Sequence, residues 1–165
     1  MGKTVATMVT IVKATPEHRS EVLRLVEQLL TELEDQPAEF SGIDLQKVRQ
    51  DLEDVQDRYT AFLAQALDGE CVGVITVMEA FAIYANGNYG IIDEMYVAPS
   101  YRSKGVGKQL IDAVKQHASA RGWLRIDVTA PPEERWVRTV RFYEAQGFVF
   151  TGPKLRYMIE QKDAL

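Results

Sequence analysis

Two glycines and three cationic side chains stand close together in the segment SYRSKGVGKQL, within a chain whose formal net charge is −5. Gly105 and Gly107 open a stretch with the spacing of an amphipathic helix. The first turn of a helix presents N–H groups without a partner in the helix, and the dipole adds positive charge there. Glycine lets an anion approach the backbone closely. With Arg102 and with Lys104 or Lys108 at the rim, the segment predicts a phosphate site.

The spacing of this segment excludes two common nucleotide-binding motifs. A Walker P-loop requires Gly-x4-Gly-Lys-Ser/Thr, but Arg102 and Gln109 occupy its first and last positions. A dinucleotide-binding fingerprint requires Gly-x-Gly-x-x-Gly, and Leu110 stands where its third glycine would be. The predicted phosphate site therefore has neither of these forms.

Apolar spacing and turn residues predict the elements that position this loop. Thr15 and Pro16 have the residue types of a helix start, and Gly122 has that of a helix end. Asp68-Gly69 is a strong hairpin turn. We expect strands at 5–13, 59–67, 71–83, 90–97, 123–130, 148–151 and 154–160, and helices at 16–33, 44–54, 105–121 and 133–146.

The order of these elements contains no repeat and no linker-like stretch. It predicts the α+β class, with a three-layer α/β arrangement in one domain. We expect a mixed central sheet of about seven strands flanked by about four helices. The strand–helix–strand unit at 90–130 should form a right-handed parallel crossover.

Composition and charge narrow the classes of function. Apolar residues make up 46% of the chain, as in a soluble globular protein, and no apolar run is long enough to cross a membrane. The acidic balance disfavours a general nucleic-acid binder. Cys71 is the only cysteine and lies in an apolar run, so we expect a buried thiol in a cytoplasmic protein. The distant His18 and His117 do not indicate a metal site.

Two motifs, considered together, resemble those of the Gcn5-related N-acetyltransferase (GNAT) family. Arg102-x-x-Gly105-x-Gly107 follows a strand and Pro99, where that family has Arg/Gln-x-x-Gly-x-Gly/Ala. FYEAQGF at 142–148 resembles the family's Phe-Tyr-x-x-x-Gly-Phe. The resemblance covers nearly the whole chain in element order and implies one acyl-CoA N-acyltransferase domain over residues 1–165.

The resemblance implies how acetyl-CoA, the co-substrate, would bind. The amides of residues 102–107 would hold the pyrophosphate, and the end of the strand at 90–97 would pair with pantetheine. It also makes a homodimer an expectation. The residues expected to bind acetyl-CoA are Met95, Tyr96, Val97, Arg102, Ser103, Lys104, Gly105, Val106, Gly107, Lys108 and Tyr143.

Acetyl transfer to an amine needs a base, because an alkylamine with a pKa near ~10.4 is almost fully protonated at neutral pH. Asp93 and Glu94 are adjacent in a predicted strand, so regular alternation sends them to opposite faces. The resemblance favours Asp93 as the base, whereas a β-bulge would favour Glu94. The resemblance also implies that Tyr143 is the acid at the departing sulfur and that the Val97 amide stabilises the oxyanion.

The chain departs from the family where Asn and Ala often precede the Phe-Tyr pair, because Trp136 and Thr139 stand there. This departure puts one pantetheine contact in doubt, and Trp136 is a candidate for packing on CoA or for the acceptor pocket. The resemblance places the acceptor among acidic, aromatic and other polar residues, which suit a small cationic amine. They are Glu34, Asp35, Phe40, Tyr84, Asn88, Arg156 and Tyr157.

The sequence therefore predicts an acetyl-CoA-dependent N-acetyltransferase that acts on a primary amine of a small molecule or peptide by direct attack. Polyamines, aminoglycosides, amino acids, and protein N-termini or lysines all stay open as acceptors. A non-catalytic acyl-CoA-binding or regulatory module is the alternative. Thiol release across a panel of amines separates the two.

Overall fold

The computed structural model describes residues 8–33, 42–129, 137–152 and 154–159. Its contacts divide the chain into two compact units, Met1–Val128 and Thr129–Leu165. The first unit holds the sheet, three of the α-helices and the predicted phosphate loop. The second holds one short helix, α4 (Val137–Ala145), and the segments that follow it.

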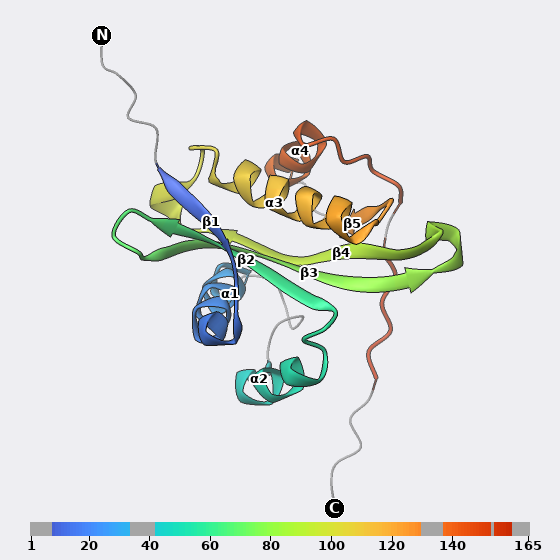
Figure 1. Cartoon of the computed structure of the whole chain (residues 1–165), viewed down its shortest axis with the longest axis horizontal. Coiled ribbons are helices and arrows are strands. Elements are labelled where there is room, and N and C mark those ends of the chain that lie inside the picture. Colours follow the sequence, from blue (N-terminus) through green and yellow to red (C-terminus); the bar gives the residue numbers. More distant parts are fainter. Residues whose placement is uncertain (1–7, 34–41, 130–136, 153, 160–165) are drawn as a thin grey trace, which may run out of the picture. The chain divides into compact units, whose positions relative to one another are not determined.

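The first unit is built on a five-stranded sheet in the order β1-β2-β3-β4-β5 (Figure 1). The first four strands pair antiparallel, and β5 pairs parallel with β4. The tight turn between β2 and β3 is the predicted Asp68-Gly69 hairpin, in which Gly69 has a left-handed φ of 87°. The strands are β1 (Val9–Lys13), β2 (Tyr59–Ala66), β3 (Cys71–Ala82), β4 (Gly87–Val97) and β5 (Ile126–Val128).

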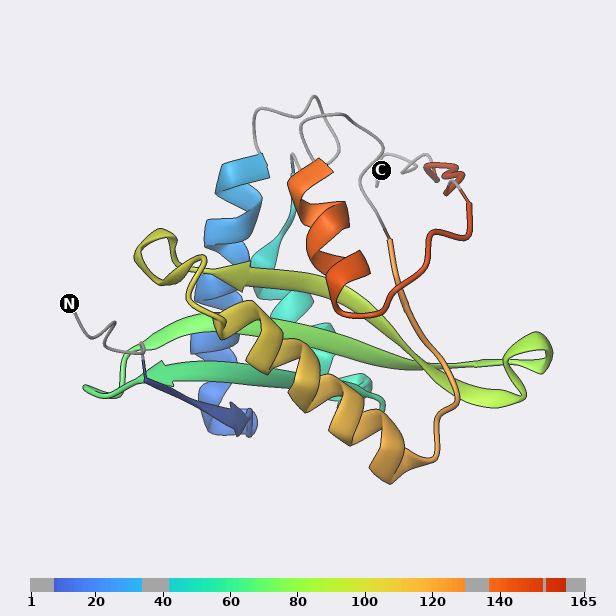
Figure 2. The same ribbon diagram turned by 90° about the horizontal axis from the view of Figure 1, so that it is seen from above.

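Helices cover both faces of this sheet (Figure 1). A 3-10 turn, η1 (Pro16–His18), leads into α1 (Arg19–Leu33), which lies on one face together with α2 (Leu45–Asp54). The opposite face carries α3 (Val106–Arg121). Figure 2 shows the crossing of α3 over the sheet and the β3–β4 hairpin that projects beyond the helices.

Apolar side chains from alternate strand positions fill both layers. On the α1 face, Val22 and Leu25 pack with Leu63, Val74 and Tyr96, all of which are buried. Cys71, predicted to be buried, belongs to the same cluster. On the other face, α3 buries the side chains that share its inner stripe. They are Val106, Leu110, Ile111, Val114 and Ala118. Burying each large aliphatic side chain contributes about 1.5–3 kcal/mol, so these two layers hold the strands in register.

The parallel β4–α3–β5 crossover is confirmed, although β5 is shorter than the strand predicted at 123–130. The helix end explains the difference. Gly122 adopts a left-handed φ of 73°, and the Trp123 N–H donates to the Ala118 carbonyl at 2.9 Å. Because that N–H closes the helix cap, it cannot join the strand ladder.

The sheet has five strands in the described residues instead of about seven. The segments 148–152 and 154–159 are described without strand pairing, so the two short strands predicted there are wrong within those ranges. The Phe148 N–H donates to the Tyr143 carbonyl at 3.1 Å and closes the end of α4 instead. The α/β class, the mixed sheet and the four helices are as predicted.

Candidate active site

The predicted phosphate loop connects β4 to the start of α3. A short 3-10 turn, η3 (Pro99–Tyr101), is followed by Ser103 and Gly105, whose φ values of 59° and 82° are both left-handed. The helix begins at Val106, and its first internal bond runs from the Gln109 N–H to the Gly105 carbonyl. A Cβ placed on Gly105 would meet no atom of the described residues within 4 Å. The backbone in front of the helix is therefore open to a ligand, as an anion site requires.

The cationic side chains of this loop are oriented by neighbouring groups. Arg102 donates from Nε to the Val97 carbonyl at 2.7 Å and pairs through Nη2 with Glu32 of α1 at 2.6 Å. Its guanidinium also lies over the Tyr96 ring, 5.4 Å from the centroid. These contacts join the loop to the end of β4 and to α1. Arg102 therefore fixes the position of the loop.

The two lysines lie closer to the helix start. Lys104 donates to the Ser100 carbonyl at 2.8 Å, and Lys108 pairs with Asp112 one turn along α3 at 2.7 Å. Both side chains come from the first turn or the loop before it, so their positive charge adds to that of the helix dipole.

One edge of β4 has no strand partner next to this loop among the described residues, and on that edge the Val97 carbonyl accepts from Arg102 Nε. The parallel partner β5 pairs only with Gly90–Ile92. No strand among those the structure describes pairs with the same edge from Met95 to Val97. An extended amide chain could add there by main-chain hydrogen bonds. The open edge at Met95–Val97 and the anion site at α3 together fit the two parts of CoA, pantetheine and pyrophosphate.

A β-bulge places both predicted carboxylates opposite one residue of β3. Ile75 pairs with Met95 and Val77 pairs with Ile92, so Asp93 and Glu94 share the position opposite Thr76. The Glu94 N–H donates to the Thr76 hydroxyl at 3.1 Å, and that hydroxyl donates to the Glu94 carboxylate. Asp93 is exposed, whereas Glu94 is half-buried. The bulge therefore makes Glu94, rather than Asp93, the stronger candidate for the base.

Burial raises the pKa of the Glu94 carboxyl above its ordinary value, and the nearby Asp93 charge acts in the same direction. The hydrogen bond from Thr76 opposes this shift because it favours the ionised form. Tyr59, on β2 beyond the intervening strand β3, has its pKa raised by burial and by the charge of Glu94. Its phenol is therefore neutral at physiological pH. A carboxyl whose pKa lies nearer neutrality is better matched to proton transfer at that pH.

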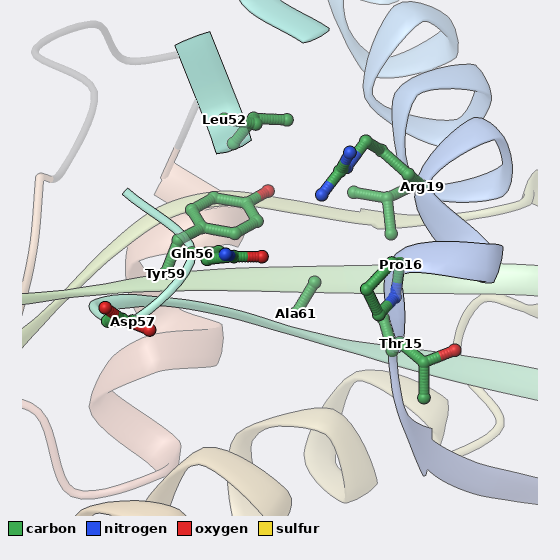
Figure 3. Close-up of a pocket in the computed structure, with 10 residues that line it drawn as sticks. Thr15, Pro16, Arg19, Leu52, Gln56, Asp57, Tyr59 and Ala61 are labelled. Carbon is green, nitrogen blue, oxygen red and sulfur yellow. The ribbon is translucent and has the colours of Figure 1, made fainter. Parts of the chain in front are cut away.

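A pocket of about 250 Å³ opens on the face of the sheet that α1 covers. It lies between the start of α1 and the segment that joins α2 to β2 (Figure 3). Figure 3 shows Arg19 and Tyr59 extending into it. Arg19 also pairs with Glu53 of α2 at 3.1 Å. The other lining residues are Ala14, Thr15, Pro16, Val22, Leu52, Gln56, Asp57 and Ala61. Sequence analysis missed this pocket, because its walls come from separate segments that carry no shared motif.

Comparison with known proteins identifies the family. The acetyltransferase (GNAT) family model matches residues 24–148. The chain belongs to the GNAT acetyltransferase family. It is accordingly an acetyl-CoA-dependent acetyltransferase, with acetyl-CoA as co-substrate. This membership argues against the non-catalytic alternative.

Among similar proteins, the "IAA acetyltransferase" of Azospirillum brasilense is 28% identical over 146 residues, which are 88% of this chain and 87% of that protein. Similar solved structures include AAC(6')-Iy with a bisubstrate analogue, at 24% identity and a TM-score of 0.73, covering 93% of this chain and 99% of that one. A Clostridium acetobutylicum predicted acetyltransferase solved with acetyl-CoA has 17% identity and a TM-score of 0.74, covering 92% and 96%. These likenesses support the fold.

In this GNAT chain, Tyr143 lies in α4 of the second unit. Its ring is buried and makes edge contacts with Phe142 and Phe148, at centroid distances of 5.4 and 5.5 Å. Burial raises the pKa of Tyr143 to about 12, so the phenol keeps its proton at physiological pH. The site geometry given above belongs to the first unit alone, and the catalytic role of Tyr143 stays a prediction. Trp136 lies outside the described residues.

The predicted acceptor residues fall in different places. Tyr84 and Asn88 flank the tip of the β3–β4 hairpin. Asn88 precedes Glu94 by six residues of β4, or roughly 20 Å of strand. This distance separates the hairpin tip from the bulge. Arg156 and Tyr157 belong to the second unit, and the predicted residues from the loop after α1 (Glu34, Asp35 and Phe40) lie outside the described residues.

The described residues contain neither a metal-binding cluster nor a membrane-spanning helix. No cluster of three or more His, Cys, Asp or Glu side chains suited to a metal occurs in the described part of the chain. Within that same part, every helix is too short or too polar to span a bilayer.

Proposed function

We propose that this enzyme transfers the acetyl group of acetyl-CoA to a primary amine of a small, cationic molecule by direct attack, with Glu94 as general base. The β4 bulge is the observation that carries the proposal. It sets a half-buried carboxyl with a raised pKa next to the strand edge that would bind pantetheine. The whole chain, residues 1–165, would act as one N-acyltransferase domain.

Glu94, Val97 and Tyr143 each have a separate proposed role in the reaction. Glu94 accepts the proton of the acceptor ammonium, directly or through water, and the amine nitrogen then attacks the thioester carbonyl carbon. The Val97 amide is the proposed donor to the developing oxyanion. The carbon–sulfur bond breaks with the Tyr143 phenol hydrogen-bonded to the departing thiolate, and the second proton of the attacking nitrogen passes to that sulfur, while Glu94 releases the first proton to water. The products are an N-acetyl amide and CoA thiol.

A cationic acceptor is favoured by the charge at the bulge. Asp93 and Glu94 lie together there, and Asp93 is exposed to an arriving ammonium. Among the similar solved structures are aminoglycoside acetyltransferases, one of them in complex with sisomicin. An aminoglycoside or a polyamine would satisfy the same charge requirement, so both belong in the test.

The test is the release of CoA thiol from acetyl-CoA across a panel of polyamines, aminoglycosides, amino acids and short peptides, with a neutral alcohol series as the control. We expect release above background hydrolysis with polycationic amines and an N-acetylated product by mass spectrometry. Binding of acetyl-CoA without release for any amine would overturn the proposal in favour of a binding module. Release with alcohols alone would overturn the amine assignment.

A further inference from the structure

Thr76 is a polar residue in the middle of an otherwise apolar strand, and its side chain is fully buried at 0% exposure. Two hydrogen bonds join its hydroxyl to Glu94, and the Tyr59 phenol also interacts with it. It accepts from the Glu94 N–H at 3.1 Å and donates to Oε2 of the Glu94 carboxylate. One hydroxyl therefore holds both the backbone and the side chain of the same residue.

The bulge explains why this arrangement is needed. An extra residue in β4 interrupts the ladder, so the Glu94 N–H cannot follow the regular pairing with β3. A buried N–H without a partner is costly, and the Thr76 hydroxyl supplies that partner. The same hydroxyl engages Oε2, so it limits the rotation of the carboxylate and directs the carboxyl group relative to the open edge of β4.

We propose that Thr76 is a positioning residue for acetyl transfer, which stabilises the β4 bulge and orients the Glu94 carboxylate towards the acceptor amine. This inference rests on the proposed function, in which Glu94 is the base. Valine, alanine or isoleucine at this position would fill the same strand site without either hydrogen bond. The proposed positioning role therefore requires a hydroxyl at position 76.

Among the described residues, Asp93 and Tyr59 are the titratable groups that act on Glu94, and neither would produce the predicted shift in the acidic limb. Asp93 shares the bulge, and its charge raises the pKa of Glu94. Tyr59 projects from β2, and its own raised pKa keeps it neutral over the range in which a carboxyl titrates. Loss of the Thr76 hydrogen bond should therefore raise the pKa of Glu94 further, because that bond favours the carboxylate.

The experiment compares Thr76→Val with Thr76→Ser in the full-length enzyme. For Thr76→Val we expect the acidic limb of the kcat/KM profile to move up by about one pH unit and kcat to fall about tenfold, with acetyl-CoA affinity unchanged within about twofold. Thr76→Ser keeps the hydroxyl, so both the acidic limb and kcat should stay close to their wild-type values. A directly observed NMR titration of the Glu94 carboxyl should show the same upward shift in Thr76→Val.

Thr60→Val is the matched control. Thr60 lies on the adjacent strand, where its hydroxyl contacts His117 of α3 on the opposite face. We expect neither the acidic limb nor the Glu94 titration to move in that variant. If Thr76→Val fails to fold, Thr76→Cys keeps a side chain of similar size with a much weaker donor and should shift the limb in the same direction.

Glu94→Gln tests the base assignment separately from the positioning role of Thr76. If Glu94→Gln loses the acidic limb but Thr76→Val and Thr76→Cys keep the wild-type limb and kcat, the role of Thr76 is overturned and the base assignment survives. If Glu94→Gln keeps the limb and the wild-type turnover, Glu94 is not the base, and the inference fails together with that part of the proposed function.

Discussion

Glu94 and Asp93 carry the same functional group at neighbouring positions, yet their surroundings differ. Asp93 is exposed, whereas Glu94 is half-buried and hydrogen-bonded to a buried hydroxyl. Desolvation penalises the ionised form, so burial tunes the Glu94 carboxyl nearer neutrality. At the scale of single residues, it is this environment that makes a carboxylate useful as a base.

The proposed role of Tyr143 leads to a prediction at the same scale. Tyr143→Phe should lower kcat about tenfold or more and leave acetyl-CoA affinity within about twofold, because only the hydrogen bond to the departing sulfur is lost. With a pKa raised to about 12, the phenol should act through a hydrogen bond rather than by complete proton transfer. Steady-state kinetics and calorimetric titration with acetyl-CoA measure the two quantities.

Tyr89→Phe is the control for this variant, since it removes a phenolic hydroxyl near the tip of the β3–β4 hairpin, away from the bulge and the phosphate loop. It should leave both kcat and affinity unchanged. Wild-type turnover in Tyr143→Phe would remove Tyr143 from the catalytic scheme.

The two glycines at the ends of helix α3 allow a controlled comparison. Gly105 and Gly122 stand at its two ends, both with left-handed φ values, and a Cβ placed on either would lie more than 4 Å from every atom in the described part of the chain. Alanine at either position should cost about 1 kcal/mol in the free energy of unfolding, because an L side chain disfavours that conformation. Only Gly105→Ala should also weaken acetyl-CoA binding, by about tenfold, since its methyl group enters the space in front of the helix.

Urea denaturation and calorimetric titration of the two variants measure these effects. Gly122→Ala controls for the strain, because it repeats the backbone change at the end of α3 that faces no proposed ligand. Equal acetyl-CoA affinities in the two variants would contradict the pyrophosphate site at the start of α3.

The stability of the first unit as a whole should depend on Glu79. This β3 carboxylate accepts from Arg121 Nε and Nη2, at 3.0 and 2.7 Å, and from Trp123 Nε1. The Arg121 hydrogen bonds lower the pKa of Glu79 below its ordinary value, and Trp123 adds to the effect, although burial opposes it. The contribution is therefore fully present above the unfolded pKa and is lost as pH falls through the lower folded value.

Glu79→Gln should accordingly reduce the free energy of unfolding at pH 7 by about 2 kcal/mol, and the gap to the wild type should narrow as pH falls below the ordinary glutamate pKa of about 4.3. Urea denaturation over that pH range measures it. Glu53→Gln removes an exposed carboxylate that pairs with Arg19 and should change stability little at any pH. A gap for Glu79→Gln that stays constant with pH would show that the carboxylate charge is not the cause.

Local chemistry in the sequence determined several parts of this molecule. The glycines at both ends of α3, the Asp68-Gly69 turn and the run of apolar spacing in α1 all act over a few residues, so their patterns predicted the elements within a few positions. The loop motif and the Phe-Tyr motif likewise led to the family that the comparison then identified.

Tertiary structure alone decided the features that depend on partners distant in the sequence. The choice between Asp93 and Glu94 depends on the register of β4 against β3, which a single extra residue reverses. The pocket at Tyr59 has walls from separate segments, and β5 is short because the Trp123 N–H closes a helix end. A strand also requires a neighbouring edge, so apolar runs such as 148–151 did not suffice to make one. Contacts of this kind form only once the chain has folded, and the sequence of either partner by itself does not contain them.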